Sequence, residues 1–333
     1  MVTIKDVAQY AGVSASTVSR VVNDNPDISP ATKKRVQAAM KKLKYTPNMA
    51  ARSLSNPKAQ SIVVVFPPMA DKYQISNPFY IGALGAINRI SQQKLFTVNT
   101  ATGDTYKEIL TSVKLLINRG QATRFIMLYA ETDDPVYDYL LENNKLVTVI
   151  GTKKNADDPV KTVDTDNHLL GVKATEYLIE RGHKKILFVT NSDEQILILD
   201  RFLGYQEAMF RSKIEALPLF LLDSDEKTTA FIETIKQIKP DAIIAVDDIF
   251  ALHLMQSVKE TGLNIPTDIS LLSFNNSPFA QVLHPYLSSY DVNVAELGET
   301  AVKQLIEPSM SDNILVPFTL IERESVIDRR NKK

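Results

Sequence analysis

The sequence contains no cysteine, so neither disulfide bonds nor thiolate zinc sites are available to it. No apolar stretch approaches the roughly 20 residues that a membrane-spanning helix requires. The first residues, Met-Val-Thr-Ile-Lys-Asp, are polar and do not have the character of a secretion signal. We therefore expect a cytoplasmic protein without membrane contact.

Signals of catalysis are also scarce. The glycine patterns that bind phosphates or dinucleotides are absent, as is the GxSxG pattern of hydrolases. The four histidines are scattered along the chain, at positions 168, 183, 253 and 284. Asp247 and Asp248 could serve acid–base or metal chemistry, but adjacent side chains rarely converge on one centre. We expect no enzyme activity, no cofactor and no metal.

What is present is the composition of a globular protein, with 333 residues that are 44% hydrophobic and 23% charged. This length predicts two or three folding units. The charge is uneven: residues 1–60 hold ten Lys and Arg against three Asp, a net +7, whereas the other 273 residues carry −8. A small basic unit on a larger acidic one suggests a polyanion-binding head, although a solvated charged face would look the same.

The basic segment has the pattern of three short helices. Thr3 is placed to cap a first helix that ends before Gly12, a residue that tolerates positive φ. Ser14 can cap a second helix over 15–22, and Ser29, followed by proline, starts a third. Helix, glycine turn, helix and supporting helix form a helix-turn-helix arrangement, whose second helix reaches base edges in the major groove.

Three side chains of the expected second helix suit base recognition. Ala15 offers a methyl contact, Ser16 can donate or accept a hydrogen bond, and Arg20 can bind guanine O6 and N7 in a bidentate manner. Helical units of this size also occur as protein-interaction modules, which is the alternative. The basic charge and the glycine turn together favour DNA.

Two stretches, "TIKDVAQYAGVSASTVSRVVN" and "ISPATKKRVQAAMKKLKYTPNMAARSL", resemble the headpiece of the LacI/GalR family of bacterial transcription regulators over residues 3–54. The resemblance implies a homodimer that binds a pseudo-palindromic operator DNA. It also implies which residues contact the DNA. These are Thr3, Ser14, Ala15, Ser16, Ser19, Arg20, Asn48, Ala51 and Leu54.

The segment "PNMAARSLSN" follows the third expected helix. Asn48 can cap a helix of about two turns, which is too short to be stable alone in water. In the LacI/GalR family this segment is a hinge helix that becomes ordered on the operator, and by resemblance Leu54 is the leucine that wedges into the minor groove. An apolar wedge partly unstacks and kinks a base step. Folding only on DNA would make binding sensitive to the spacing of the two subunits.

From Ile62 onward, apolar runs alternate with amphipathic stretches, which predicts parallel sheets with helices on both faces. Such sheets bind ligands beyond the carboxyl ends of their strands. The apolar runs predict strands at 62–66, 96–100, 125–129, 147–150, 185–190, 220–222, 242–246 and 269–274. The patterns between them predict helices at 82–92, 107–118, 169–181, 201–210, 228–238 and 249–261.

This body resembles the periplasmic-binding-protein-like core of the same family through "NPFY", "VDTDNHLLGVKATEYLIERGHKKI", "DRFLGYQEAM" and "LGETAVKQLIE". The implied fold is α plus α/β: a helix-turn-helix headpiece followed by two doubly wound α/β subdomains. The chain would cross between them near Asp164, Val292 and Ile321. The implied domains are the headpiece (1–46), a hinge helix and linker (47–60), an N-terminal core subdomain (61–164 plus 293–321) and a C-terminal core subdomain (165–292 plus 322–333).

Five residues are implied as ligand contacts by their match to that core. Phe79 and Tyr80 follow the first strand and can stack on a sugar or another ring. Arg201 matches the arginine of the family's pocket, whose planar fork can hold two hydroxyls. Asp247 and Asn275 follow two strands and can bond hydroxyls, although many relatives carry Asn at the first position and Asp at the second.

Each of these residues also has a purely structural alternative. Asp247 can serve only as a helix cap, and Phe79 and Tyr80 can belong to the core. Arg201 can form a surface ion pair. The sequence leaves these alternatives open.

The resemblance implies a repressor of a sugar-utilisation operon, released by a small-molecule effector bound between the core subdomains. "FIMLYAETDDP" and "LLSFNNSPF" resemble the maltose-type regulators within the family, which makes maltose or a maltodextrin the first effector to consider. The chain ends soon after its last expected strand, without the leucine heptads that tetramerise some relatives, so we expect a dimer. The alternatives are a corepressor-dependent regulator that responds to another sugar, and a solute-binding or sensor protein without a repressor role.

Overall fold

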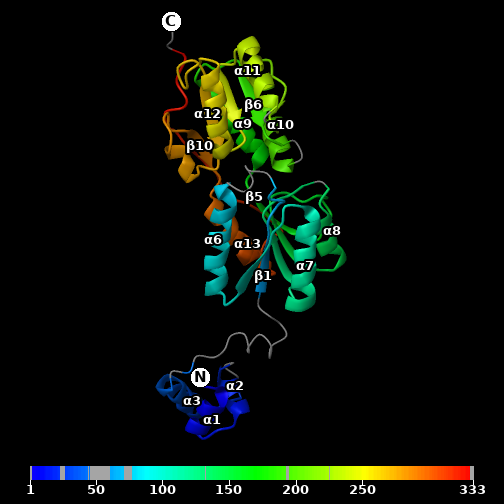
Figure 1. Cartoon of the computed structure of the whole chain (residues 1–333), viewed down its shortest axis with the longest axis vertical. Coiled ribbons are helices and arrows are strands. Elements are labelled where there is room, and N and C mark those ends of the chain that lie inside the picture. Colours follow the sequence, from blue (N-terminus) through cyan, green and yellow to red (C-terminus); the bar gives the residue numbers. More distant parts are fainter. Residues whose placement is uncertain are drawn as a thin grey trace. The chain divides into compact units, whose positions relative to one another are not determined.

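The computed structural model describes residues 2–22, 27–43, 45, 61–70, 77–131, 133–192, 195–224 and 226–330. The chain divides into two compact units, Met1–Ala59 and Gln60–Lys333, which we call the head and the core unit (Figure 1). Each unit is described by itself. In the described part of the chain, no helix is both long enough and apolar enough to cross a membrane.

The head begins with two short helices, α1 (Ile4–Ala11) and α2 (Ala15–Val22). Thr3 and Asp6 form a capping box at the start of α1: the Asp6 N–H donates to Thr3 Oγ1 and the Thr3 N–H donates to Asp6 Oδ2, at 3.4 and 2.7 Å. Gly12 ends α1 with φ of 62°, a left-handed conformation that glycine adopts without strain. The glycine turn expected from the sequence is therefore present.

A third helix, α3 (Pro30–Lys42), completes the head, with Ser29 as its N-cap and proline at its first position. The three helices bury one small apolar cluster at their centre. Its buried members are Val7, Ala8, Ala11, Val18, Val21, Val36 and Ala39. Because these residues recur at helical spacing, each helix places its polar residues outward and the trihelical unit holds together around the cluster.

The core unit contains two six-stranded sheets. The first sheet has the strand order β11-β5-β4-β3-β1-β2, and all of its neighbouring strands are parallel. Its strands are β1 (Ser61–Val65), β2 (Thr97–Ala101), β3 (Arg124–Met127), β4 (Leu146–Ile150), β5 (Lys161–Asp164) and β11 (Asn313–Leu315). The helices α6 (Pro78–Gln93), α7 (Tyr106–Gly120), α8 (Pro135–Glu142) and α13 (Val294–Ile306) belong with it. Figure 1 shows α6 and α13 on one face of this sheet and α7 and α8 on the other. We call this assembly the first subdomain.

The second sheet has the order β12-β10-β9-β8-β6-β7, and only the pairing of β10 with β12 is antiparallel. Its strands are β6 (Ile186–Thr190), β7 (Phe220–Leu221), β8 (Ala242–Ala245), β9 (Ser270–Phe274), β10 (Ser288–Asp291) and β12 (Thr319–Ile321). The helices α9 (Asn167–Glu180), α10 (Ile196–Arg211), α11 (Glu226–Ile238) and α12 (Asp248–Glu260) and the short η1 (Pro278–Gln281) complete the second subdomain.

The chain crosses between the two sheets three times: after β5, after β10 and between β11 and β12. The crossing segments are tied together, because the Val316 N–H donates to the Asp164 carbonyl at 2.8 Å and Asn293 Nδ2 donates to the Pro317 carbonyl at 2.6 Å. The third crossing differs from the expected boundary at Ile321. Ile321 pairs with Ser289 of β10, so the chain has already joined the second sheet by β12.

Apolar strands covered on both faces explain the two sheets. All five residues of β1, Ser-Ile-Val-Val-Val, are buried, as are all residues of β6, β8 and β9. Strands that are apolar on both faces must be covered by helices on both faces, as in parallel α/β sheets. One apolar cluster includes residues of both subdomains, among them Tyr80 and Leu297 of the first and Leu170 and Phe274 of the second.

Candidate DNA-binding surface and ligand cavity

The exposed side of α2 carries the residues expected to read DNA. Ser16 and Arg20 are exposed and lie four residues apart, hence on one face of the helix. Val18 and Val21 are buried on the opposite side. Ala15 and Ser19 are partly buried beside this face. The arrangement leaves the Arg20 guanidinium free to approach a base edge.

Three of the expected DNA contacts, Thr3, Ser14 and Ser16, have structural partners within the head. Thr3 holds the capping box of α1. The Ser14 hydroxyl accepts from the Thr17 N–H at 3.1 Å and lies 2.8 Å from the Ser16 hydroxyl. All three side chains remain exposed, so these bonds do not exclude a contact with DNA. The other three expected contacts, Asn48, Ala51 and Leu54, lie outside the described residues.

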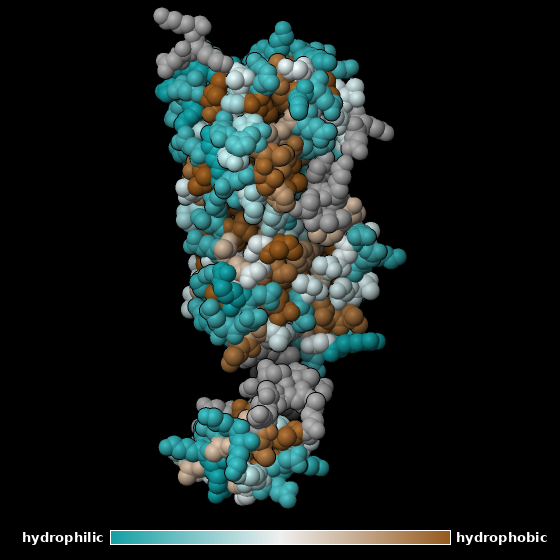
Figure 2. Space-filling view, turned by 60° about the vertical axis from the view of Figure 1, so that its left-hand side comes forward, coloured by the Kyte–Doolittle hydropathy of each residue, from teal (hydrophilic) through white to brown (hydrophobic). Residues whose placement is uncertain are grey.

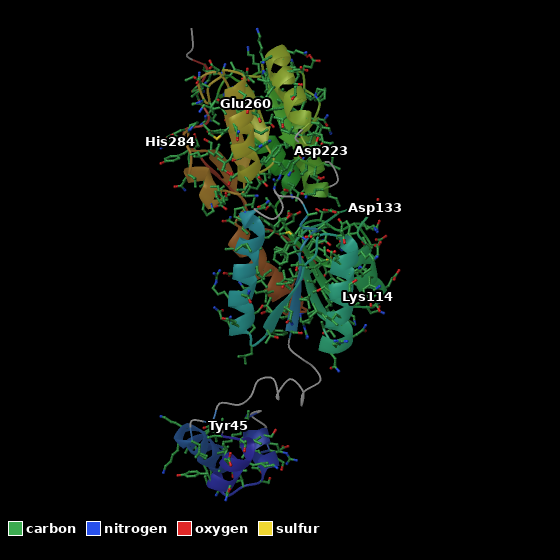
Figure 3. All side chains as sticks on the ribbon, viewed as in Figure 1. Tyr45, Lys114, Asp133, Asp223, Glu260 and His284 are labelled. Carbon is green, nitrogen blue, oxygen red and sulfur yellow. The ribbon has the colours of Figure 1, made fainter. Side chains whose placement is uncertain are left out.

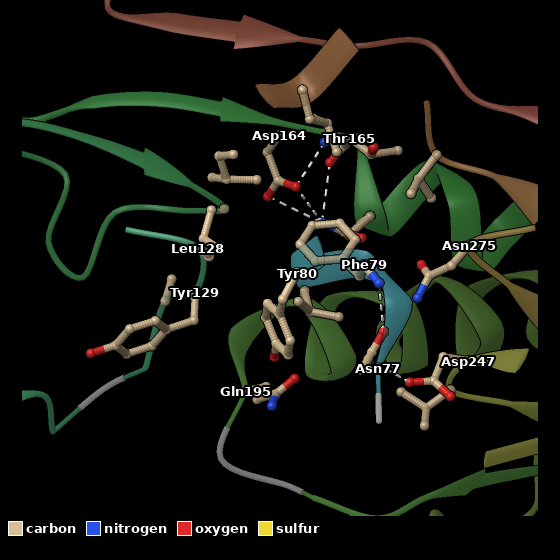
Figure 4. A pocket seen from close by; sticks show the side chains of 18 of the residues that line it. Asn77, Phe79, Tyr80, Leu128, Tyr129, Asp164, Thr165, Gln195, Asp247 and Asn275 are labelled. Atoms are coloured by element: carbon tan, nitrogen blue, oxygen red, sulfur yellow. Dashed lines mark hydrogen bonds between the residues drawn. The ribbon is translucent and has the colours of Figure 1, made fainter. Parts of the chain in front are cut away.

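All five residues expected to bind a ligand line one cavity of the core unit (Figure 4). The cavity walls come from segments that follow the carboxyl ends of strands in both sheets, where ligands bind in open α/β sheets. These segments follow β1, β3, β4, β5, β6, β8, β9 and β10. The two subdomains therefore build one site together.

Arg201 reaches the cavity from α10 and is only 5% exposed. Its Nε donates to Asn167 Oδ1 at 2.9 Å, its Nη1 donates to the Val246 carbonyl at 3.3 Å, and its guanidinium carbon lies 4.5 Å from the centre of the Phe274 ring. Burial lowers the pKa of Arg201 to about 10, an effect that the carboxylates of Asp164 and Asp247 oppose. The arginine is therefore a buried cation held in a fixed position and not a surface ion pair.

Close packing of α9 on α10 sets the place of Arg201. A Cβ atom on Gly171 would lie 2.0 Å from the Arg201 carbonyl oxygen, and one on Gly204 would lie 2.1 Å from the His168 carbonyl oxygen. Only glycine allows the two helix backbones to approach this closely. Gly171 and Gly204 thus determine where the Arg201 guanidinium enters the cavity.

Asp247 has two roles that the sequence suggested as alternatives. It caps α12, since its Oδ1 accepts from the Phe250 N–H at 2.8 Å, and it also lines the cavity. Its Oδ2 accepts from Asn77 Nδ2 at 3.0 Å, and Asn77 in turn caps α6 by accepting from the Phe79 N–H. Burial raises the pKa of Asp247 to about 6. Asn77 was missed in the sequence, although asparagine followed by proline is a helix-start signal.

The two aromatic residues differ in accessibility. Tyr80 is only 7% exposed and belongs to the apolar cluster, with its ring centre 6.0 Å from that of Phe66. Phe79 is partly exposed and meets Tyr80 edge to face at 5.7 Å. Both rings line the cavity, but Phe79 has more free surface for stacking.

Asn275 follows β9 in a left-handed conformation with φ of 88°, and its N–H donates to the Tyr290 carbonyl at 2.8 Å. Asp248, which follows Asp247 in the chain, does not line the cavity. Its carboxylate accepts from the hydroxyls of Ser273 and Ser289 and from the Ser277 N–H. Asp247 and Asp248 therefore act at different places, as adjacent residues usually do.

Asp164 is a second residue that was missed as part of the site. It ends β5, lines the cavity and accepts hydrogen bonds from the Thr165 N–H, Asn167 Nδ2 and Thr152 Oγ1. Burial raises its pKa to about 6. No group of histidine and carboxylate side chains that could hold a metal occurs within the described ranges.

Comparison with known proteins places the chain in a family. Residues 3–48 match the lacI family of bacterial regulatory proteins, and residues 175–326 match a periplasmic binding protein-like domain. The HTH-type transcriptional regulator MalR of Staphylococcus xylosus is 34% identical over an alignment that covers 98% of this chain and 98% of that protein.

Solved structures show the same fold. The lac repressor dimer bound to operator and the anti-inducer ONPF matches with a TM-score of 0.81 at 24% identity, over 98% of this chain and 99% of that one. A probable maltose operon transcriptional repressor, malR of Staphylococcus aureus, matches with a TM-score of 0.76 at 21% identity, over 82% of this chain and 99% of that one. The chain belongs to the LacI family of bacterial regulatory proteins and is a DNA-binding transcriptional regulator, not an enzyme.

Proposed function

We propose that the protein represses an operon for maltose or maltodextrin utilisation and leaves its operator when a neutral sugar fills the cavity of the core unit. The similarity to MalR of Staphylococcus xylosus over nearly the whole chain supports this regulator type. The name of the same relative, a MalR protein, motivates maltose as the sugar. Such a regulator would act in the bacterial cytoplasm, where its operator lies.

Two heads would bind the two halves of a pseudo-palindromic operator, with α2 of each head in the major groove. The exposed Ser16 and Arg20 support this placement, because they share the face that would meet the bases. Ala15 would add a methyl contact to the bases, and Thr3, Ser14 and Ser19 would contact phosphates or sugars beside that face. Asn48, Ala51 and Leu54 would bind the minor groove at the centre of the site.

A homodimer is needed for two heads to reach one operator. The core unit offers apolar surface for pairing, in groups that hydrophilic residues separate (Figure 2). Exposed apolar side chains occur in both subdomains, on and after α6 and around η1. They include Ile81, Leu95, Phe279, Val282 and Leu283. Surface of this kind favours pairing with a second copy.

The observation that carries the ligand proposal is the convergence of five expected residues on one cavity between the subdomains. Phe79 supplies an aromatic face for the apolar side of a sugar ring, with Tyr80 packed behind it. Arg201, Asp247 and Asn275 supply donors and acceptors for hydroxyl groups. An aromatic face combined with a few placed polar groups is typical of sites for small polar molecules.

Release from DNA would follow from the position of the cavity. A ligand that contacts both subdomains favours one angle between them over others. In a dimer this angle sets the distance between the two hinge segments, and so the fit to the operator. To change operator occupancy from mostly bound to mostly free, the sugar must prefer the DNA-incompetent state by several kcal/mol.

The test combines a binding screen with a release assay. Neutral sugars and sugar phosphates are screened by thermal shift, because a ligand that binds only the native state raises its stability. Operator DNA, first selected from a pseudo-palindromic library, is then followed by fluorescence anisotropy as the best ligand is added. Maltose or a maltodextrin should raise the melting temperature and release the DNA.

The variant Arg201→Ala should bind operator but fail to respond to the sugar. A normal response from this variant would mean that the pocket is misplaced. No thermal shift with maltose or maltodextrins would reject this sugar class. If sugar tightened operator binding, the protein would be a corepressor-dependent regulator, and if it bound sugar but no DNA it would be a solute sensor.

A further inference from the structure

Three charged side chains line the cavity: Asp164, Arg201 and Asp247. Among the residues that the structure describes, no other Asp, Glu, Lys, Arg or His lines it. Two carboxylates therefore face one guanidinium. Neither carboxylate forms an ion pair with Arg201 in the described part of the core, since Arg201 bonds to Asn167 and to a backbone carbonyl. The cation is thus presented to the cavity with only part of its charge compensated.

Two features of the cavity favour an anion. Arg201 is one, because a guanidinium binds phosphate in a bidentate manner. The other is the presence of helix starts: Asn77, Gln195 and Asp247 are the N-cap residues of α6, α10 and α12, and all three line the cavity. Helix N-termini carry a partial positive charge that attracts phosphate groups.

The two carboxylates do not oppose this attraction equally. Asp247 is the N-cap of α12 and also accepts a hydrogen bond from Asn77, so its charge is placed against the positive ends of its own helix and of α6. Asp164 caps no helix. It ends a strand, and its neighbour Asp166 is the residue that caps α9. Its negative charge is therefore held by the Thr165 N–H and by the side chains of Asn167 and Thr152, and not as the cap of a helix.

One side chain connects Asp164 to Arg201. Asn167 Nδ2 donates to both carboxylate oxygens of Asp164 at 3.1 Å, and its Oδ1 accepts from Arg201 Nε at 2.9 Å. The amide keeps the two charges apart but fixes their positions. A phosphate placed on Arg201 would therefore lie close to a fixed negative charge. Because Arg201 is buried, water would screen the repulsion less there than in bulk solution.

We propose that Asp164 excludes phosphorylated and other anionic sugars from this cavity, so that the regulator responds to the neutral sugar and not to its phosphate ester. This inference rests on the proposed function for the identity of the site. It adds the residue that selects the chemical class of the effector. Removing the charge of Asp164, while keeping its shape, should turn the cavity into one that accepts anions.

The test compares the wild-type protein with Asp164→Asn. In this variant the side-chain oxygen can still accept from the Thr165 N–H and Asn167 Nδ2, and its amide can donate to Thr152 Oγ1. Only the second bond from Asn167 Nδ2, to Oδ2, is lost. Asp164→Ser is a second neutral variant, for use if the first does not fold. Asp166→Asn is the matched control, because asparagine caps a helix as well as aspartate and Asp166 does not line this cavity.

Binding is measured by calorimetry with maltose and maltose 6-phosphate, and by thermal shift with inorganic sulfate at matched ionic strength. The wild-type protein and Asp166→Asn should prefer maltose to its phosphate by at least about a hundredfold and gain no stability from sulfate. Asp164→Asn should narrow this preference by at least about tenfold, which corresponds to about 1.4 kcal/mol in the difference between the two binding free energies. It should also be stabilised by sulfate.

An unchanged preference in both neutral variants would overturn the proposal, as would equal binding of the two sugars by the wild-type protein. The sulfate measurement separates this proposal from the assignment of maltose. If the wild-type protein ignores maltose but sulfate stabilises Asp164→Asn alone, the selector role stands and the sugar is wrong. If sulfate stabilises no variant more than the wild type, the selector role is wrong.

Discussion

Asn77 Nδ2 donates a hydrogen bond of 3.0 Å to Asp247 Oδ2, and this bond joins the two subdomains beside the ligand cavity (Figure 4). Each residue also caps a helix of its own subdomain, Asn77 at α6 and Asp247 at α12. Two helices from different sheets therefore begin at one contact. A ligand that competes for Asp247 therefore changes one of the contacts between the two subdomains.

The variant Asn77→Asp should open the core unit. Aspartate keeps the cap of α6 but removes the donor and places a second carboxylate beside Asp247. The native absence of cysteine allows spin labels at Lys114→Cys and Glu260→Cys, two exposed positions that lie in different subdomains (Figure 3). Pulsed electron paramagnetic resonance should show a longer distance between the two labels in Asn77→Asp than in the same labelled protein with Asn77.

Asn77→Ser serves as the control for this opening. Serine keeps the cap and adds no charge, so it should produce a smaller shift than aspartate. An unchanged distance distribution in Asn77→Asp would show that the Asn77–Asp247 bond does not set the angle between the subdomains.

The stability of the protein should depend on Asp164 in a pH-dependent way. Burial raises the pKa of Asp164 to about 6 from an ordinary value of 3.8. The folded state therefore holds this proton more tightly than the unfolded chain, and the resulting stabilisation is present in acid and lost as the pH rises through about 6. Asp164→Asn has no such titration.

Relative to the wild-type protein, the unfolding free energy of Asp164→Asn should rise by about 2 kcal/mol between about pH 4 and about pH 7.5. This value allows for the partial exposure of the side chain, which reduces the effect of burial. Urea unfolding at the two pH values measures the difference. A constant difference would mean that Asp164 titrates alike in the folded and unfolded chain.

Apolar pattern predicted most of the core unit from the sequence. The eight predicted strands are present with ends shifted by one or two residues, since buried runs such as those of β1 and β6 have no other stable placement. Four strands were missed: β5, β10, β11 and β12 are three or four residues long and read Lys-Thr-Val-Asp, Ser-Ser-Tyr-Asp, Asn-Ile-Leu and Thr-Leu-Ile. Such segments become strands only through pairing with neighbours distant in sequence.

The candidate site, like the sheets, was predicted only in part from the sequence. The resemblance to the family's core implied five ligand contacts, and these five side chains do line one cavity. Asn77 and Asp164 were missed as site residues because their positions depend on contacts between subdomains. Two helices, α8 and α13, were also missed. The start of α8 has a local signal in the sequence, Asp134 followed by proline. The start of α13 has none, because Asn293 begins this helix at a crossing and without a side-chain cap.

Arg20→Ala should weaken operator binding by about 1–3 kcal/mol and relax the preference at one G·C pair of each half-site. The reason is the loss of a bidentate contact from the exposed face of α2. Anisotropy titrations against operator and scrambled DNA measure both effects. Lys34→Ala, an exposed change on α3, should by contrast lower affinity for both DNAs alike. If Arg20→Ala kept the wild-type ratio of affinities for operator and scrambled DNA, Arg20 would have no role in base recognition.

Leu54→Ala should weaken operator binding and reduce DNA bending, while sugar affinity stays as in the wild-type protein. The physical reason is the loss of an apolar wedge between base pairs. Hydrogen exchange of residues 48–54 should be fast in the free protein and slow on operator DNA. Strong protection without DNA would argue against folding on the operator.

The central claim, that a neutral sugar in the core cavity and operator DNA on the heads oppose each other, has one most direct test. Maltose is titrated calorimetrically into the protein alone and into the protein saturated with operator. Because coupling between two binding sites is reciprocal, operator should lower the affinity for maltose by the same factor by which maltose lowers the affinity for operator. Equal maltose affinity with and without operator, or tighter binding with it, would contradict the claim.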